Sequence, residues 1–169
     1  GWAPEKPFYW VGNEPCFGAV YVYNYLQKPW KAQENVRRVM EFFKNSPDGM
    51  PGDDDAGAMS ALYVFSAIGL YPYLPGASEL TITGPVFEKV TISLDDGKKV
   101  IITAEGAAND APYIQSMKIN GKENSKLGLD WSKLSDGGNI SFKMGKKPNK
   151  KWGSSKQDIP YSYFPKSEK

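Results

Sequence analysis

The stretch GMPGDDDAGAMSALYVFSAIG, residues 49–69, carries the clearest structural signal in the chain. A Pro-Gly turn precedes three successive aspartates, residues 53–55, and an apolar segment then runs to Gly69. The apolar residues occupy nearly all sides of a 3.6-residue period, which is typical of a helix buried on several sides. We therefore predict a helix over about residues 55–68, with Gly69 as its C-terminal cap.

The three aspartates allow three interpretations. An aspartate at a helix start can cap the free N–H groups of the first turn, where the helix dipole also favours negative charge. A calcium loop of the EF-hand type would need oxygen ligands at alternate positions and a final glutamate, which this stretch lacks. Alternatively, Asp53 and Asp55 stay ionised at the helix start and act as a general base on water. The residues alone leave the cap and the base open.

A second turn, GNEP at residues 12–15, sets Asn13 and Glu14 between a glycine and a proline. One interpretation is an ordinary polar surface turn. The other is a site for a hard cation, because amide, carbonyl and carboxylate oxygens are the ligands that Ca²⁺ prefers. Aromatic residues, which form cores as readily as they line sugar sites, crowd the chain before this turn: Trp2, Phe8, Tyr9 and Trp10.

Composition excludes several classes of protein. The 169 residues include 21 Lys and Arg against 19 Asp and Glu. The resulting net charge of +2 is too small to indicate a nucleic-acid-binding protein. No apolar run is long enough to span a membrane, and we expect no signal peptide at this N-terminus. Histidine is absent, which excludes a histidine general base, a Ser-His-Asp triad and a zinc site built on imidazole within this chain. Because Cys16 is the only cysteine, no disulfide forms within the chain.

The chain changes character near residue 75. Helices are expected at residues 18–26, where the residue types suit a strand as well, and at residues 29–45. The second helix has apolar residues on one face and polar residues on the other. The apolar face comprises Val36, Val39, Met40 and Phe43, and the polar face comprises Arg37, Arg38, Glu41 and Lys44. Strands are expected in a hairpin at 89–104 and at 113–120 and 138–145, with turns at Asp-Gly and Asn-Gly pairs.

The predicted helices cannot fully bury one another. Two of them are apolar on more than one side, so their exposed faces require partners. We therefore expect the chain to be a fragment of a larger enzyme. The predicted division is residues 1–75 as helices, 76–153 as strands and 154–169 as an irregular tail.

Together these stretches resemble the C-terminal part of glycoside hydrolase family 92, the calcium-dependent, exo-acting α-mannosidases. The resemblance covers about residues 10–153, and the order and spacing of its segments agree. These segments are GNEPC, YVYNYLQKPWKAQENVRRVM, PDGMPGDDDAGAMSALYVFSAIGLYPYLPG, YIQSMKING and GGNISFKMGKKPNKKWG. It implies an α+β chain: the last helices of an (α/α)6 barrel in residues 1–75, followed by an antiparallel β C-terminal segment.

The resemblance also implies a reaction and a site. The family removes terminal α-linked mannose from N-glycans or mannans with inversion, by a carboxylic acid and a carboxylate base that activates water. The base candidates match Asp53 and Asp55. The metal position of the family matches Asn13 and Glu14, where Ca²⁺ would orient the sugar.

This sequence departs from the family at two points. Phe17 and Gly18 stand where the family usually has a histidine, so a polar contact to the sugar is missing. The general acid of the family lies far upstream, and Glu5 is too close to the GNEP turn to replace it. We therefore expect the N-terminal remainder of the same enzyme to be a partner and to supply the acid. Family habit implies a secreted or periplasmic location. The alternative is a non-catalytic carbohydrate-binding or structural fragment of the same fold.

Overall fold

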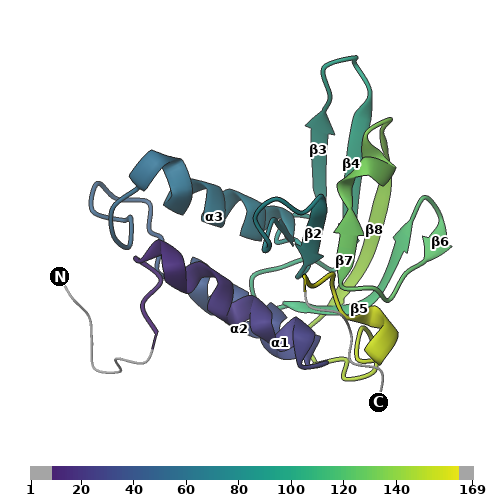
Figure 1. Ribbon diagram of the computed structural model, residues 1–169, viewed down its shortest axis with the longest axis horizontal. Coiled ribbons are helices and arrows are strands. Elements are labelled where there is room, and N and C mark those ends of the chain that lie inside the picture. The colour runs from purple at the N-terminus through teal and green to yellow at the C-terminus, as the bar shows by residue number, and fades with distance from the viewer. Residues whose placement is uncertain (1–8, 164–169) are drawn as a thin grey trace.

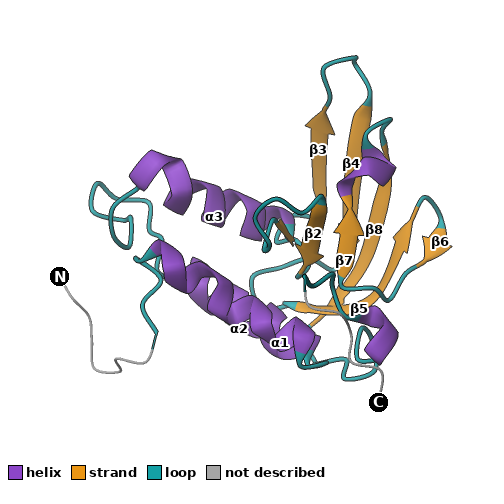
Figure 2. Cartoon of the chain, viewed as in Figure 1, coloured by secondary structure: helices purple, strands orange, loops and turns teal. Residues whose placement is uncertain are grey.

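The computed structural model describes residues 9–163 and consists of a helical part and a strand part that meet at one end (Figures 1 and 2). The helices, short 3-10 helices included, are η1 (Glu14–Tyr21), α1 (Val22–Tyr25), α2 (Pro29–Met40), η2 (Asp55–Gly57), α3 (Ala58–Ile68), η3 (Trp131–Leu134) and η4 (Lys156–Asp158). The strands are β1 (Leu70–Tyr71), β2 (Glu79–Ile82), β3 (Lys89–Ser93), β4 (Lys99–Glu105), β5 (Tyr113–Ile119), β6 (Lys122–Glu123), β7 (Gly128–Asp130) and β8 (Gly138–Gly145). The predicted α+β class is confirmed.

The strands form a three-stranded sheet, in the order β1-β2-β7, and a five-stranded sheet, in the order β3-β4-β8-β5-β6. The prediction of an antiparallel segment was wrong at one pair, since β4 and β8 run parallel from Val100 opposite Gly138 to Glu105 opposite Lys143. The long connection from β4 to β8, which contains β5 to β7, lets β8 return in the same direction. The sheet is therefore mixed.

The predicted strands are otherwise confirmed. The Asn120-Gly121 turn has positive φ values of 48° and 79°, as a two-residue hairpin turn of type I′ requires. Strand β8 has the predicted bounds, and its alternate residues Ile140, Phe142 and Met144 are buried. Alternation of apolar and polar residues therefore set the inner face of this strand.

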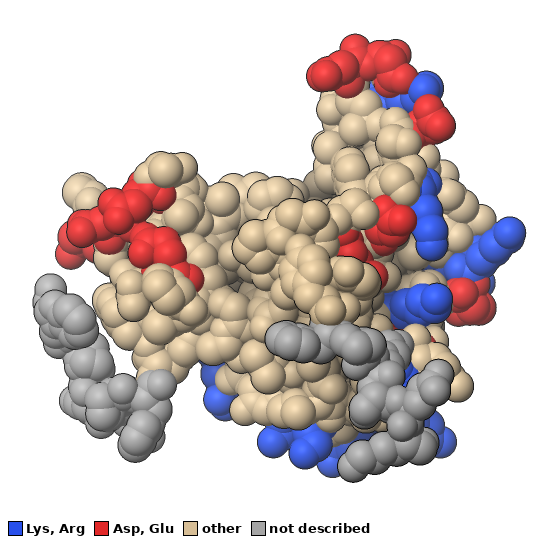
Figure 3. Space-filling view, viewed as in Figure 1, with Lys and Arg blue, Asp and Glu red and all other residues tan. Residues whose placement is uncertain are grey.

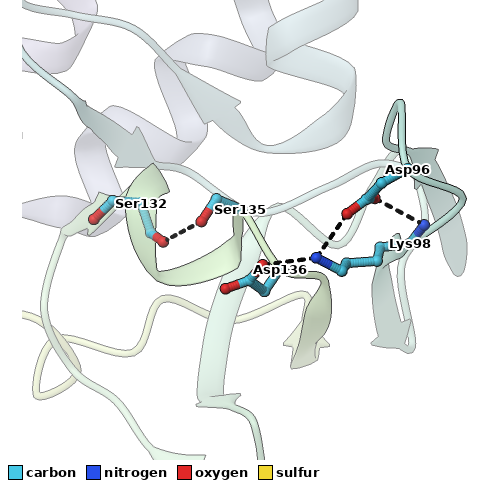
Figure 4. A network of polar contacts seen from close by, with 5 residues as sticks. All are labelled: Asp96, Lys98, Ser132, Ser135 and Asp136. Atoms are coloured by element: carbon cyan, nitrogen blue, oxygen red, sulfur yellow. Dashed lines mark hydrogen bonds and ion pairs between the residues drawn. The ribbon is translucent and has the colours of Figure 1, made fainter.

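A polar network holds the tip of the β3–β4 hairpin to the connection between η3 and β8 (Figure 4). The Lys98 ammonium lies 2.6 Å from the Asp96 carboxylate and 2.7 Å from the Asp136 carboxylate. In the same connection the Ser135 hydroxyl donates to the Ser132 carbonyl oxygen at 2.8 Å. These charged groups are all exposed, so the network orients the hairpin tip more than it stabilises the fold.

Helix α2 differs from its prediction in two ways. It ends at Met40 rather than near Asn45. Arg37, predicted on the polar face, is buried, and its guanidinium donates to the Pro85 carbonyl oxygen at 2.7 Å. Burial lowers the pKa of Arg37 to about 10. The segment before β3, which contains Pro85, covers this position. The helical periodicity of the sequence could not predict this, because the covering segment lies far along the chain.

Helix α3 begins later than predicted. It starts at Ala58, not near Asp55, because Ala56 and Gly57 have left-handed φ values of 51° and 80° that interrupt the helix. Its predicted end is confirmed, since Gly69 has a φ of 84° and caps the last turn.

Each part has its own apolar core, and buried polar contacts join the two. Leu70 belongs to the core of the sheets, whereas the adjacent Tyr71 packs on the core of the helices. The Gln33 amide oxygen of α2 accepts from the Ile114 backbone N–H of β5 at 3.2 Å, and both residues are buried. The helices and the sheets are therefore held in one arrangement by groups that must stay paired.

The helical part leaves large apolar side chains exposed, as the sequence predicted. Val64 of α3 is 53% exposed and Tyr63 is 40% exposed. Leu26, after α1, is 55% exposed. Such faces are typical of surfaces that another segment covers.

Candidate active site

The GNEP turn and the aspartate turn touch through two glycines. Gly52 has a φ of 105°, and a Cβ atom there would lie only 2.5 Å from the Gly12 carbonyl oxygen. A Cβ atom at Gly12 would in turn overlap the Pro51 carbonyl oxygen and the Trp10 ring. Only glycine permits this approach of the two backbones. The contact brings the predicted metal turn beside the predicted catalytic turn.

Of the three aspartates, Asp54 is the one that contacts the helix start. Its carboxylate accepts from the Ser60 backbone N–H at 2.9 Å and from the Ser60 hydroxyl at 2.6 Å. These two hydrogen bonds, the hydroxyl first, lower the pKa of Asp54. The capping function that the sequence allowed for this aspartate cluster therefore belongs to the middle residue.

Asp53 and Asp55 are exposed, and within residues 9–163 neither carboxylate has a hydrogen-bond or ion-pair partner. Figure 3 shows acidic side chains gathered at this end of the helical part. A carboxylate free of partners can accept a proton from a water molecule that is placed beside it.

An open groove of about 1040 Å³ lies next to the contact between the turns. Asp53 lines it, together with Trp10 and residues at the end of α2 and just after it. Among the four residues predicted for the site, Asn13, Glu14 and Asp55 do not line this groove in the described part of the chain. The structure therefore places Asp53 in the groove wall and leaves the other three outside the groove lining.

Asn13 and Glu14 lie at the start of η1. Asn13 is exposed, and its amide nitrogen lies 3.9 Å from the Cys16 sulfur. Its amide oxygen and the half-buried Glu14 carboxylate have no hydrogen-bond partner among residues 9–163. Both are oxygen donors of the kind that Ca²⁺ takes, but Ca²⁺ needs six to eight ligands. Within those same residues, no group of three acidic, histidine or cysteine side chains could hold a metal. These two residues therefore fit part of a calcium site.

The two described aromatic residues near the GNEP turn have different surroundings. Tyr9 packs against the core of the helices, and burial raises its pKa. Trp10 lines the groove and meets Phe42 edge to face, with ring centroids 6.2 Å apart. Trp2 and Phe8 lie outside the described residues.

The groove lining includes three charged residues of the second predicted helix that the sequence did not indicate for a site: Arg38, Glu41 and Lys44. They were assigned to the polar face of the second helix, where charged residues usually meet solvent. Arg38 also pairs with Glu34 one turn earlier at 2.9 Å. The spacing from Arg38 to Glu41 put them on one face, but no local signal shows that this face borders a groove.

Comparisons with known proteins agree on one family. A model of the glycosyl hydrolase family 92 catalytic domain matches residues 3–146. The chain is 31% identical over 157 residues to an uncharacterized secreted glycosidase of Arthroderma benhamiae, covering 90% of this chain and 20% of that protein.

Two solved structures give the same result. The chain is similar to a family GH92 α-mannosidase of Bacteroides thetaiotaomicron, with 38% identity and a TM-score of 0.87 over 92% of this chain and 21% of that one. It is also similar to a family GH92 inverting mannosidase of the same organism, with 41% identity and a TM-score of 0.85 over 92% and 21%. The chain thus spans about a fifth of the length of these relatives.

Proposed function

This chain belongs to glycosyl hydrolase family 92, and we propose that it is the C-terminal part of an exo-acting α-mannosidase. The proposed reaction is hydrolysis of terminal α-linked mannose in N-glycans or mannans, with inversion. The observation that carries the proposal is the backbone contact between Gly12 and Gly52. It sets the two candidate turns side by side at an open groove, where a substrate could meet both.

Asp53 or Asp55 is the proposed general base. Each is exposed and free of partners among residues 9–163, whereas Asp54 is occupied by Ser60. The base takes a proton from water, and the oxygen of that water attacks the anomeric carbon while the glycosidic bond breaks. A carboxylic acid in the N-terminal remainder protonates the leaving oxygen, at the wide separation that an inverting mechanism requires.

Asn13 and Glu14 are the proposed calcium ligands in this chain. When bound, Ca²⁺ would stabilise charge and orient the sugar hydroxyls. Two side chains cannot complete a site that needs six to eight ligands. The other ligands would come from the N-terminal part of the enzyme, the substrate and water.

The N-terminal remainder of the enzyme is also the proposed partner for the exposed apolar face of α3. The relatives are about five times longer than the part that matches here, so they contain enough chain to cover Tyr63 and Val64. In residues 9–163 no helix is long and apolar enough to cross a membrane. Because the Arthroderma relative is described as secreted, we propose a secreted or periplasmic enzyme.

The test uses the complete enzyme, meaning this chain with the N-terminal remainder. Asp53→Asn and Asp55→Asn are made separately, and hydrolysis of an aryl α-mannoside is measured. Loss of the base should lower kcat by roughly 100-fold or more in at least one variant, with the melting temperature unchanged. Asp95→Asn, at the exposed hairpin tip, is the matched control and should retain full activity.

Two further readouts complete this test. The first product should be β-mannose by NMR, and EDTA should reduce activity in a way that added Ca²⁺ restores. An active enzyme in which neither aspartate matters would overturn the base assignment. A wild-type enzyme that binds mannosides without hydrolysing them would support the non-catalytic alternative instead.

A further inference from the structure

The hydrogen bonds between Asp54 and Ser60 close a loop that contains one proposed base residue, Asp55, and that directly follows the other, Asp53. They join the middle aspartate to the first turn of α3, at 2.9 Å for the amide and 2.6 Å for the hydroxyl. A third hydrogen bond, from the Gly57 N–H to the Asp54 carbonyl oxygen at 2.9 Å, lies inside the same loop. Asp54 is thus anchored through its side chain and its backbone.

The enclosed backbone is strained. Ala56 has a φ of 51°, in the left-handed region that residues with a Cβ atom rarely adopt, and Gly57 follows with a φ of 80°. A non-glycine residue keeps such a conformation only when surrounding contacts enforce it. The Asp54 carboxylate reaches across this loop and accepts two hydrogen bonds from Ser60.

We propose that Asp54 and Ser60 form a positioning pair that holds the loop of residues 53–57, and with it Asp53 and Asp55, in the geometry needed for catalysis. The inference rests on the proposed function for its catalytic consequence. Asp54 does not itself take the proton from water, because both of its oxygens already accept hydrogen bonds from Ser60. The lowered pKa of Asp54 agrees with this role, since an ionised carboxylate is the better acceptor for two donors.

The chain offers a matched control for such a pair. The Asp130 carboxylate accepts from the Ser132 backbone N–H at 3.0 Å and from its hydroxyl at 2.8 Å, at the start of η3. Asp130 lies in the strand part and does not line the groove. Removing this contact deletes the same kinds of hydrogen bond without touching the aspartate turn.

The experiment compares Asp54→Ala with Asp130→Ala in the complete enzyme, below the melting temperature of both. We expect Asp54→Ala to lower kcat by roughly 10- to 100-fold, because a displaced catalytic group loses its alignment with the substrate. KM should change less than about threefold, because Asp54 does not bind substrate. Asp130→Ala should leave kcat within about twofold of wild type. Equal losses in both variants would overturn the proposal.

Conservative variants separate positioning from direct chemistry. Asp54→Asn keeps an oxygen acceptor for the amide and an NH₂ group for the hydroxyl, so it should retain most of the activity. Ser60→Thr should do the same, while Ser60→Ala should fall between Asp54→Ala and wild type. If Asp54→Asn loses as much activity as the inactive base variant, Asp54 acts directly and the positioning role is wrong.

Amide hydrogen exchange tests the pair without an activity assay. Asp54→Ala should speed exchange of the Gly57 amide, whose partner is in the loop, while amides of β8 stay as in wild type. Faster exchange in an enzyme that shows no hydrolysis would reject the proposed function but keep the anchoring role. Unchanged exchange would reject the positioning pair, whatever the activity.

Discussion

The two parts of the molecule treat their large apolar side chains differently. In the five-stranded sheet, Ile102, Ile140 and Phe142 are at most 4% exposed. The exposed large apolar side chains lie on the helical part or in connections, and within the described residues none belongs to a strand. They are Val22, Leu26, Phe42, Met50, Tyr63, Val64, Phe87, Tyr161 and Tyr163. The sheet buries its own core, whereas the helical part leaves large apolar side chains at its surface.

The turns of the two parts differ in the same way. Gly97, in the β3–β4 turn, has a φ of 80° and open space around it. Gly52 has a φ of 105° and meets the backbone at Gly12. The first glycine serves a local turn, and the second serves a contact between segments that are distant in the sequence.

The largest expected effect on stability comes from a substitution in the core of the five-stranded sheet. Ile140→Ala removes a fully buried side chain from β8 and should lower the free energy of unfolding by about 2–5 kcal/mol. Val64→Ala, on the exposed face of α3, should cost about 1 kcal/mol in the complete enzyme if the remainder covers it. Urea denaturation measures both. No change for Val64→Ala would contradict the proposed covering of this face.

The next effect concerns the glycine contact. Gly97→Ala should lower the free energy of unfolding by about 1–2 kcal/mol. The added methyl group has open space, so the only penalty is the left-handed backbone conformation that alanine disfavours. Gly52→Ala should cost about 2–4 kcal/mol, because its methyl group also overlaps the backbone of Gly12. It should abolish most of the hydrolysis, which Gly97→Ala should leave intact. Equal costs for the two variants would show that the turns do not touch as described.

A smaller effect is expected from acid titration of Asp54. Its folded pKa lies below the ordinary value of 3.8, so the ionised group stabilises the fold above that value. This contribution is lost as the pH falls from 3.8 through the folded pKa. The difference in unfolding free energy between wild type and Asp54→Asn should therefore shrink as the pH falls through this window.

Asp130 provides the parallel case in the strand part, since Ser132 lowers its pKa through the same two kinds of hydrogen bond. The difference in unfolding free energy between wild type and Asp130→Asn should likewise shrink as the pH falls. Chemical denaturation at a series of pH values measures it. If the difference in unfolding free energy from wild type stays constant with pH for both variants, these hydrogen bonds do not favour the ionised carboxylates.

The smallest effect is expected at the hairpin tip. Asp136→Asn removes one exposed partner of Lys98, which keeps Asp96 as its other partner. Exposed ion pairs contribute little, so the melting temperature should not change measurably. A loss as large as that of Gly97→Ala would mean that this network stabilises the hairpin rather than only orienting it.

The sequence by itself determined the features that depend on near neighbours. The bounds of β8, the Asn120-Gly121 turn and the Gly69 cap follow from alternation and from glycine at positive φ, and each was predicted. It also indicated the residue types of the candidate site, and the roles of Asp53, Asp55, Asn13 and Glu14 stay predictions.

The tertiary structure alone decided the features that depend on distant partners. The burial of Arg37, the parallel pairing of β4 with β8 and the groove beside α2 each need a segment that lies far along the chain. The contact of Gly12 with Gly52 belongs to the same class. Local periodicity records which face of an element is apolar, but which segments meet is set by packing across the whole molecule.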